Sequence, residues 1–217
     1  MNGELIQDIF FKTEKNKLTT TIRLAEDFDF TQYSVRQVLF PDLNAPIVGD
    51  AENPCAELLA GIQGKNVITS ARATGIQWWS PSCPAMYRLT TELISPNEEL
   101  AFSRVDRIAF RDIKYEGKQF FLNGLSLSRQ QAMEIKTEPL TVDQSHIEQC
   151  NTDGTLIVIE IDQGLDEKSL VRAVERLRNS PSVLAWDLSS KSEFKLRNAL
   201  FCSIDGTRPV IYGFNTK

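Results

Sequence analysis

The first part of the chain alternates between apolar and polar residues in short runs. This period of two is typical of β-strands that are covered on one face. Residues 18–24 form such a run, and residues 5–11 are rich in β-forming side chains. The two segments flank the polar stretch 14–17 and together predict a β-hairpin. Residues 67–79 and 86–94 are interpreted as further extended segments, the second with a competing helical interpretation.

A meander is expected between residues 100 and 127. The dipeptide Asn123-Gly124 is the strongest hairpin signal of the chain, because both residues tolerate the positive φ angles of a tight turn. One short helix is expected in this mostly β part, within residues 53–64. There Asn53 can cap the helix and Pro54 suits its first position.

The pattern changes in the last third of the chain. Residues 128–136 and 141–150 predict helices, and 155–162 is a nearly continuous apolar run, typical of a strand that is covered on both faces. Residues 166–179 carry one apolar stripe at helical spacing, and 182–188 form the next strand. A strand, a helix and a strand in this order predict a parallel pair with a right-handed crossover.

A short helix and two strands, 200–204 and 209–214, complete the prediction. The fold class that follows is α+β: a mostly antiparallel β region over the N-terminal two-thirds, then a smaller C-terminal unit that contains a βαβ motif. We expect the β-rich region at 1–139 and the α/β region at 140–217. The sequence leaves open whether the two regions share one core.

Composition narrows the class of protein. With 217 residues, 41% hydrophobic and 24% charged, the chain is expected to be a soluble, folded globule. The net charge of −5 disfavours duplex nucleic acid as a partner, since such surfaces are basic. Neither a membrane-spanning run nor a secretory signal is recognised. We therefore expect a cytoplasmic protein with reduced thiols at its scattered cysteines, Cys55, Cys83, Cys150 and Cys202.

Acidic residues near strand ends are the first candidate site. Three predicted strands each end near an aspartate, namely Asp162, Asp187 and Asp205, and Glu160 shares a strand face with Asp162. If the strands of Asp162 and Asp187 are parallel neighbours, both carboxylates lie at the edge where such sheets bind ligands. Mg²⁺ is the one cofactor that this arrangement suggests. The competing interpretation is turn formation, which aspartate favours at strand ends.

Two weaker metal or thiol signals were considered. His146 and Cys150 lie four residues apart on a predicted helix, which supplies half of a zinc site or, alternatively, part of a semi-buried stripe. Cys83 follows Trp79 at the spacing of a thioredoxin-type motif, but Ser80 stands in place of the attacking cysteine. We interpret that match as accidental and expect only a free thiol.

Basic and aromatic residues give two candidate binding surfaces. Arg107 and Arg111 would share a strand face among aromatic residues, which is a pattern suited to single-stranded nucleic acid. Surface ion pairs on a sheet give the same pattern. Trp78 and Trp79 point to opposite faces of an extended segment, so one could be exposed as a contact residue, although burial of both is the favoured interpretation.

The sequence does not establish a function. The hypothesis it favours is a non-catalytic cytoplasmic protein that acts through contact with another protein, as an interaction or assembly factor. The first alternative is a Mg²⁺-dependent phosphodiesterase or phosphotransfer enzyme that uses Asp162, Asp187 and Glu160. The second alternative is a single-stranded nucleic-acid binder that uses Arg107 and Arg111. Oligomeric state and substrate stay open.

Overall fold

The chain forms two compact units in a computed structural model, and each unit is described by itself. The structure describes residues 5–42, 53–128, 132–136, 143–161, 164–188 and 191–214. Unit 1 comprises residues 1–78 and 85–110, and unit 2 comprises residues 79–84 and 111–217. Unit 2 is therefore discontinuous in sequence, because a six-residue segment between two strands of unit 1 belongs to it.

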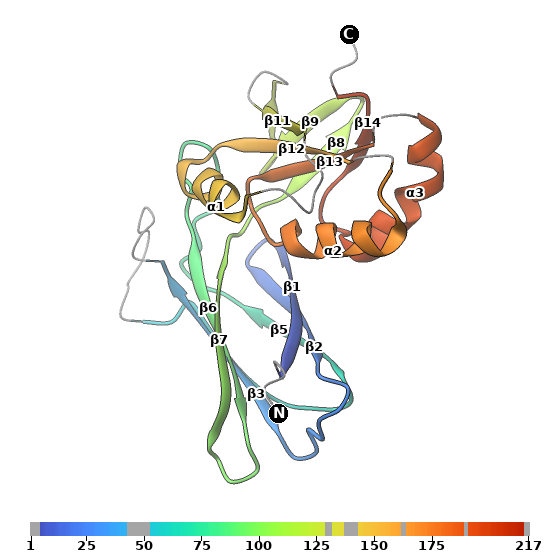
Figure 1. Cartoon of the computed structure of the whole chain (residues 1–217). Coiled ribbons are helices and arrows are strands. Elements are labelled where there is room, and N and C mark those ends of the chain that lie inside the picture. The colour runs from blue at the N-terminus through green and yellow to red at the C-terminus, as the bar shows by residue number, and fades with distance from the viewer. Residues whose placement is uncertain are drawn as a thin grey trace. The chain divides into compact units, whose positions relative to one another are not determined.

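Unit 1 consists of two antiparallel sheets (Figure 1). The three-stranded sheet has the order β1-β2-β5, with β1 Ile6–Glu14, β2 Lys17–Leu24 and β5 Asn66–Arg72. The four-stranded sheet has the order β4-β3-β6-β7, with β4 Ala56–Gly61, β3 Ser34–Pro41, β6 Tyr87–Ile94 and β7 Leu100–Ile108. This seven-stranded order is that of an immunoglobulin-type sandwich in which the fourth strand pairs with the third.

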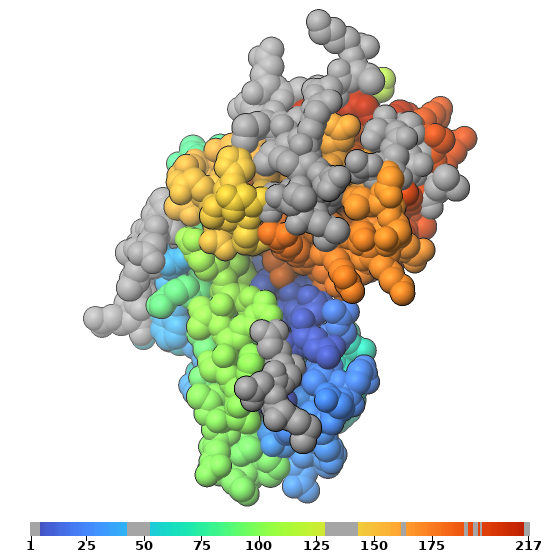
Figure 2. All heavy atoms as spheres, in the orientation of Figure 1, coloured from blue at the N-terminus to red at the C-terminus, as the bar shows by residue number. Residues whose placement is uncertain are grey.

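The core of unit 1 lies between these sheets and follows from the period of two. On β2 every second side chain, including those of Leu18 and Ile22, is buried, whereas the alternate ones are more exposed. Val35 and Leu39 of β3 lie in the same buried cluster. The strand β7 has its outward side chains exposed, as its light-green atoms in Figure 2 show, and it forms an edge of the sheet.

The prediction of a helix within residues 53–64 is wrong. Residues Ala56–Gly61 form the strand β4, which pairs with β3 from Leu39 opposite Ala56 to Ser34 opposite Gly61. Asn53 and Pro54 give a local helix-start signal, but pairing with a neighbouring strand outweighs such weak preferences. The strands expected around 18–24 and 86–94 are confirmed.

Unit 2 begins with a three-stranded antiparallel meander of the order β10-β9-β8. Its strands are β8 Ile113–Glu116, β9 Gln119–Leu122 and β10 Leu125–Leu127. Asn123 and Gly124 form the turn between β9 and β10 with φ angles of 54° and 81°. The hairpin predicted from this dipeptide is therefore confirmed, and its geometry is the left-handed one that the two residues tolerate.

A four-stranded parallel sheet follows in the order β11-β12-β13-β14. Its strands are β11 Ala132–Lys136, β12 Leu156–Ile161, β13 Val183–Leu188 and β14 Val210–Tyr212. The helices α1 Gln144–Asp153, α2 Glu167–Leu177 and α3 Lys191–Ile204 connect successive strands. The parallel pairing of β12 with β13 across α2, on which the carboxylate hypothesis depends, is confirmed.

The helix α2 illustrates why this region of unit 2 can be predicted from the sequence. The carboxylate of Asp166 accepts a hydrogen bond from the Ser169 backbone and caps the first turn. Leu170, Val174 and Leu177 of one stripe are at most 1% exposed and belong to the core of unit 2. Both β12 and β13 are almost wholly buried, as their continuous apolar runs predict.

Two other elements of unit 2 differ from expectation. Residues 132–136 were expected in a helix but form β11, because five of them pair in parallel with β12. Residues 200–204 were expected as a strand but continue α3, where Phe201 contacts Trp186 with ring centroids 5.9 Å apart. Short apolar runs fit either element, and tertiary pairing decides between them.

The coarse fold class is confirmed, since the described elements are mostly strands in antiparallel sheets. The compact units divide between residues 110 and 111, whereas the expected boundary between the two regions lies at residues 139 and 140 and stays a prediction. Within the described residues, no helix has both the length and the apolar character needed to span a membrane.

Candidate functional site

The carboxyl edge of the parallel sheet brings together Asp187, one of the three strand-end acids that the sequence singled out, and Glu160. Glu160 on β12 and Asp187 on β13 are register partners, so their side chains leave the same face of adjacent strands. In the next strand Lys136 is in register with Glu160, and on the other side Ile211 is in register with Asp187. This row of residues is the candidate site.

Asp187 has a structural contact at that site. Its side chain is 2% exposed, and its Oδ2 accepts a hydrogen bond of 2.9 Å from the Phe214 backbone nitrogen. The carboxylate therefore holds the segment that follows β14 against the end of β13. A buried backbone N–H requires such a partner.

The magnesium hypothesis requires carboxylates that converge at this edge of the sheet. Asp162, which this hypothesis pairs with Asp187, lies outside the described residues. Among the residues that the structure describes, no three side chains of His, Cys, Asp or Glu gather in a way that could hold a metal ion. The Mg²⁺ role of Asp162, Asp187 and Glu160 stays a prediction.

Asp205, the third of these acids, follows the helix α3 and not a strand. Its carboxylate is fully buried. Its Oδ2 accepts hydrogen bonds of 2.9 Å from Trp186 Nε1 and from Arg208 Nη1, and its Oδ1 accepts from Thr207. Burial by itself raises the pKa of Asp205, but Arg208 and these hydrogen bonds outweigh it, and the pKa lies below its usual value. The group is an internal ion pair that fixes the start of the turn before β14.

The lowered pKa of Asp205 gives a pH dependence of defined sign. A carboxyl group whose pKa is lower in the folded state stabilises the fold above its unfolded pKa, near 3.8, and this stabilisation is lost as the pH falls through the lower, folded pKa. We expect the difference in unfolding free energy between the wild type and Asp205→Asn to be largest at neutral pH and to narrow below about pH 4. Urea unfolding at pH 7, 5, 4 and 3 measures it. A constant difference across that range would contradict the assignment.

The arginines proposed for nucleic-acid binding lie in different units. Arg107, on β7, forms an ion pair of 2.6 Å with the buried carboxylate of Asp42. Arg111 donates to the backbone carbonyl oxygens of Ser180, Pro181 and Val183. Burial, followed by the charge of Arg208, holds the pKa of Arg111 well below its usual range, against the opposing effect of Asp205.

These carbonyls explain how unit 2 accommodates buried cations. The carbonyls of Ser180 and Pro181 belong to the turn after α2, and that of Val183 belongs to the first residue of β13. The C-terminal end of a helix favours positive charge. Arg208 donates to the same stretch of backbone, from Nε to Val183 at 2.9 Å and from Nη2 to Ser180 at 2.6 Å. A role of Arg107 and Arg111 in nucleic-acid binding stays a prediction, while the observed contacts of Arg111 are structural.

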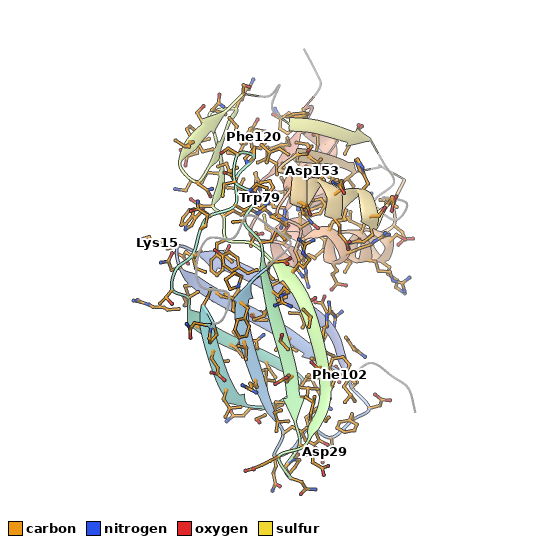
Figure 3. All side chains as sticks on the ribbon, turned by 90° about the vertical axis from the view of Figure 1, so that its left-hand side faces the viewer. Lys15, Asp29, Trp79, Phe102, Phe120 and Asp153 are labelled. Atoms are coloured by element: carbon orange, nitrogen blue, oxygen red, sulfur yellow. The ribbon has the colours of Figure 1, made fainter. Side chains whose placement is uncertain are left out.

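The two adjacent tryptophans belong to different units. Trp78 is half-buried and packs against the core of unit 1, whereas Trp79 is fully buried and belongs to unit 2. Trp79 is labelled in Figure 3. Trp79 Nε1 donates to the Asn151 carbonyl oxygen at 2.8 Å, and Asn123 Nδ2 donates to the Trp79 carbonyl at 2.8 Å. The burial that the sequence favoured is confirmed for Trp79.

The remaining candidates occupy local contacts. His146 Nε2 and Cys150 Sγ lie 3.8 Å apart on α1, as their spacing predicts. Burial, with Asp153 adding to it, raises the pKa of Cys150, so its thiol is not activated. Cys83 closes a tight turn with Ser80, whose Oγ accepts a hydrogen bond from the Cys83 backbone at 3.1 Å. Zinc binding by the pair on α1 stays a prediction.

Sequence reasoning missed the residues that hold these groups in place. Arg208 and Asn151 were not singled out, yet Arg208 pairs with Asp205, and the Asn151 side chain accepts hydrogen bonds from both the backbone and the hydroxyl of Ser182. The only local signal was the spacing of Asp205 and Arg208, three residues apart. That spacing is common and does not by itself indicate burial.

Comparison with known proteins places the fold but not the function. No protein-family model matches the sequence, and no curated protein does. Solved structures do match the fold. A glycosyl hydrolase family 2 member from Bacteroides cellulosilyticus DSM 14838 is 16% identical with a TM-score of 0.73, and the match covers 98% of this chain and 36% of that one.

Two further solved structures of similar fold are those of β-glucuronidases. The enzyme from Parabacteroides merdae is 16% identical with a TM-score of 0.69, over 96% of this chain and 33% of that one. The FMN-binding enzyme from Facaelibacterium prausnitzii L2-6 is 14% identical with a TM-score of 0.70, over 97% of this chain and 39% of that one. The chain thus spans little more than a third of these structures, and at such identities the likeness concerns the fold alone.

Proposed function

We propose that this chain is a non-catalytic protein with a glycosidase-like fold that acts through contact with another protein. The observation that carries the proposal is the burial of Asp187 and its hydrogen bond to the backbone. Its carboxylate is 2% exposed and accepts a hydrogen bond from the Phe214 backbone, so it supports the fold at the edge where a reactive group would be expected. A general acid or base must instead reach the proton that it transfers.

Three further residues that the sequence singled out as site candidates also form contacts within the fold. Arg111 binds carbonyl oxygens of its own unit, and Asp205 is paired with Arg208. Trp79 donates to the backbone of α1. Trp78 is half-buried and retains exposed surface, which makes it the tryptophan to substitute when binding to a protein partner is measured.

Glycoside hydrolysis is the second candidate, and one specific observation favours it. Glycosidases use a pair of carboxylates, and the register places Glu160 beside Asp187 on adjacent parallel strands. Solved structures of similar fold include a glycosyl hydrolase family 2 member, a β-glycosidase and a β-glucuronidase. The two candidates make opposite predictions for substitutions at Asp187.

The test combines stability with turnover. We expect Asp187→Ala to lower the unfolding free energy by about 1–3 kcal/mol, because the Phe214 backbone N–H loses its buried acceptor. Asp187→Asn is the matched control, since its amide oxygen can still accept that bond. Urea unfolding measures the free energy of both variants.

In parallel, chromogenic aryl β-glycosides, including a β-glucuronide, are incubated with the wild type and the two variants, and we expect no turnover by any of the three proteins. Turnover by the wild type that is lost in a folded Asp187→Asn protein would overturn the proposal in favour of hydrolysis.

A further inference from the structure

A group of four polar side chains lies inside the apolar core of unit 1. Thr20 and Thr69 are register partners on β2 and β5 of one sheet, and Gln37 and Thr91 are register partners on β3 and β6 of the other. All four are at most 5% exposed. A buried polar group destabilises the fold unless it is hydrogen-bonded, so each of them requires a partner.

Three of the four are joined in one network that crosses the sandwich. Thr69 Oγ1 donates to Gln37 Oε1 at 2.6 Å, from one sheet to the other, and Gln37 Nε2 donates to Thr91 Oγ1 at 3.0 Å within the second sheet. The Thr20 hydroxyl has no hydrogen-bond partner among the residues that the structure describes, although it is 1% exposed. It lies beside Thr69, at the end of this network.

A small cavity adjoins the same residues. Thr20, Gln37 and Thr69 line it, together with apolar side chains such as Leu39 and Leu89. The space that it offers to the centre of a water molecule is about 10 Å³, which is at the lower limit for a single water, on the order of 10–15 Å³.

We propose that this cavity is a binding site for one structural water molecule that joins the Thr20 hydroxyl to the Gln37–Thr69 pair. The remaining hydrogen-bonding capacity fits a water, which both donates and accepts. Gln37 Nε2 has a second hydrogen to donate, Thr69 Oγ1 can still accept, and the Thr20 hydroxyl can do either. The water completes a polar network between the two sheets that favours one register over slipped alternatives, because a slip would leave several buried groups unpaired.

The experiment is a high-resolution crystal structure of the whole chain and of three variants. The wild type should show a density peak about 3 Å from Thr20 Oγ1 and within hydrogen-bonding distance of Gln37 or Thr69. Thr20→Ser keeps the hydroxyl and should keep the peak, whereas Thr20→Val should lose it. Thr21→Val is the matched control, because the side chain of Thr21 lies on the opposite face of the same strand and its loss should leave the peak in place.

Oxygen-17 relaxation dispersion of the same proteins gives a second readout. The number of long-lived waters should fall by one in Thr20→Val and stay unchanged in Thr20→Ser and Thr21→Val. A wild-type structure without the peak, or a peak that persists in Thr20→Val, overturns the proposal. If Thr20→Val does not fold, the wild type and Thr20→Ser decide the matter by the presence or absence of the peak.

Discussion

Replacing Trp79 by alanine should lower the free energy of unfolding by about 3–5 kcal/mol, the range for removing a large buried aromatic side chain. Trp79 is fully buried, and its indole N–H pairs with the Asn151 carbonyl. The substitution leaves both a cavity and a buried carbonyl that has lost this donor, and the second effect adds to the first. Chemical denaturation followed by far-UV circular dichroism measures the change.

Trp78 supplies the matched control, because it is the same residue type one position away. Its side chain is half-buried against the core of unit 1, so Trp78→Ala should cost roughly 1–2 kcal/mol and leave the protein folded. Equal losses in the two variants would contradict the different burial of the two tryptophans. A folded Trp78→Ala protein is also the form in which loss of partner binding can be separated from loss of structure.

Gly154→Ala should be comparably destabilising, by roughly 2–5 kcal/mol. Gly154 ends α1 with a φ of 74°, a left-handed conformation that strains any residue with a Cβ. A Cβ there would also lie 2.8 Å from Pro81 Cα and closer still to the Pro81 carbonyl oxygen. Because both contacts are with backbone atoms, no side-chain rotation relieves them. The thermal midpoint and the urea midpoint both report the loss.

Gly124→Ala separates the two causes. Gly124 has a similar φ of 81°, but a Cβ built on it meets nothing within 4 Å. Gly124→Ala should therefore lower the free energy of unfolding through backbone strain alone, by about 1–2 kcal/mol. If Gly154→Ala costs no more than Gly124→Ala, the close approach of the segment 79–84 to the end of α1 is refuted.

The parts of the fold that the sequence predicted are those whose signal is local and periodic. The stripe of Leu170, Val174 and Leu177 indicated α2, and Asn123-Gly124 indicated its turn. The elements that were wrong, residues 56–61, 132–136 and 200–204, are short runs that fit either a helix or a strand. For the first two, the deciding interaction is pairing with a strand elsewhere in the chain, which no local window contains.

The candidate site was predictable to the same extent. The parallel crossover was predicted and places Glu160 beside Asp187 as expected. The partners that define the state of each group could not be read from sequence, because they lie far away along the chain. Phe214 is 27 residues from Asp187, and Asn151 is 72 residues from Trp79. Residue type identifies groups capable of chemistry, whereas only the tertiary contacts show whether a group is occupied in holding the fold.

The interrupted sequence of unit 2 determines how the polypeptide can be divided. A fragment that starts at residue 111 would lack Trp79 and the turn 80–84, so the Asn123 amide and the Asn151 carbonyl would each lose a bonding partner. Residues 1–110 would in turn carry an orphaned apolar indole. Cleavage between residues 110 and 111 would therefore separate Trp79 from the Asn123 and Asn151 groups that it binds. Both halves of unit 2 are present only in an uncut chain.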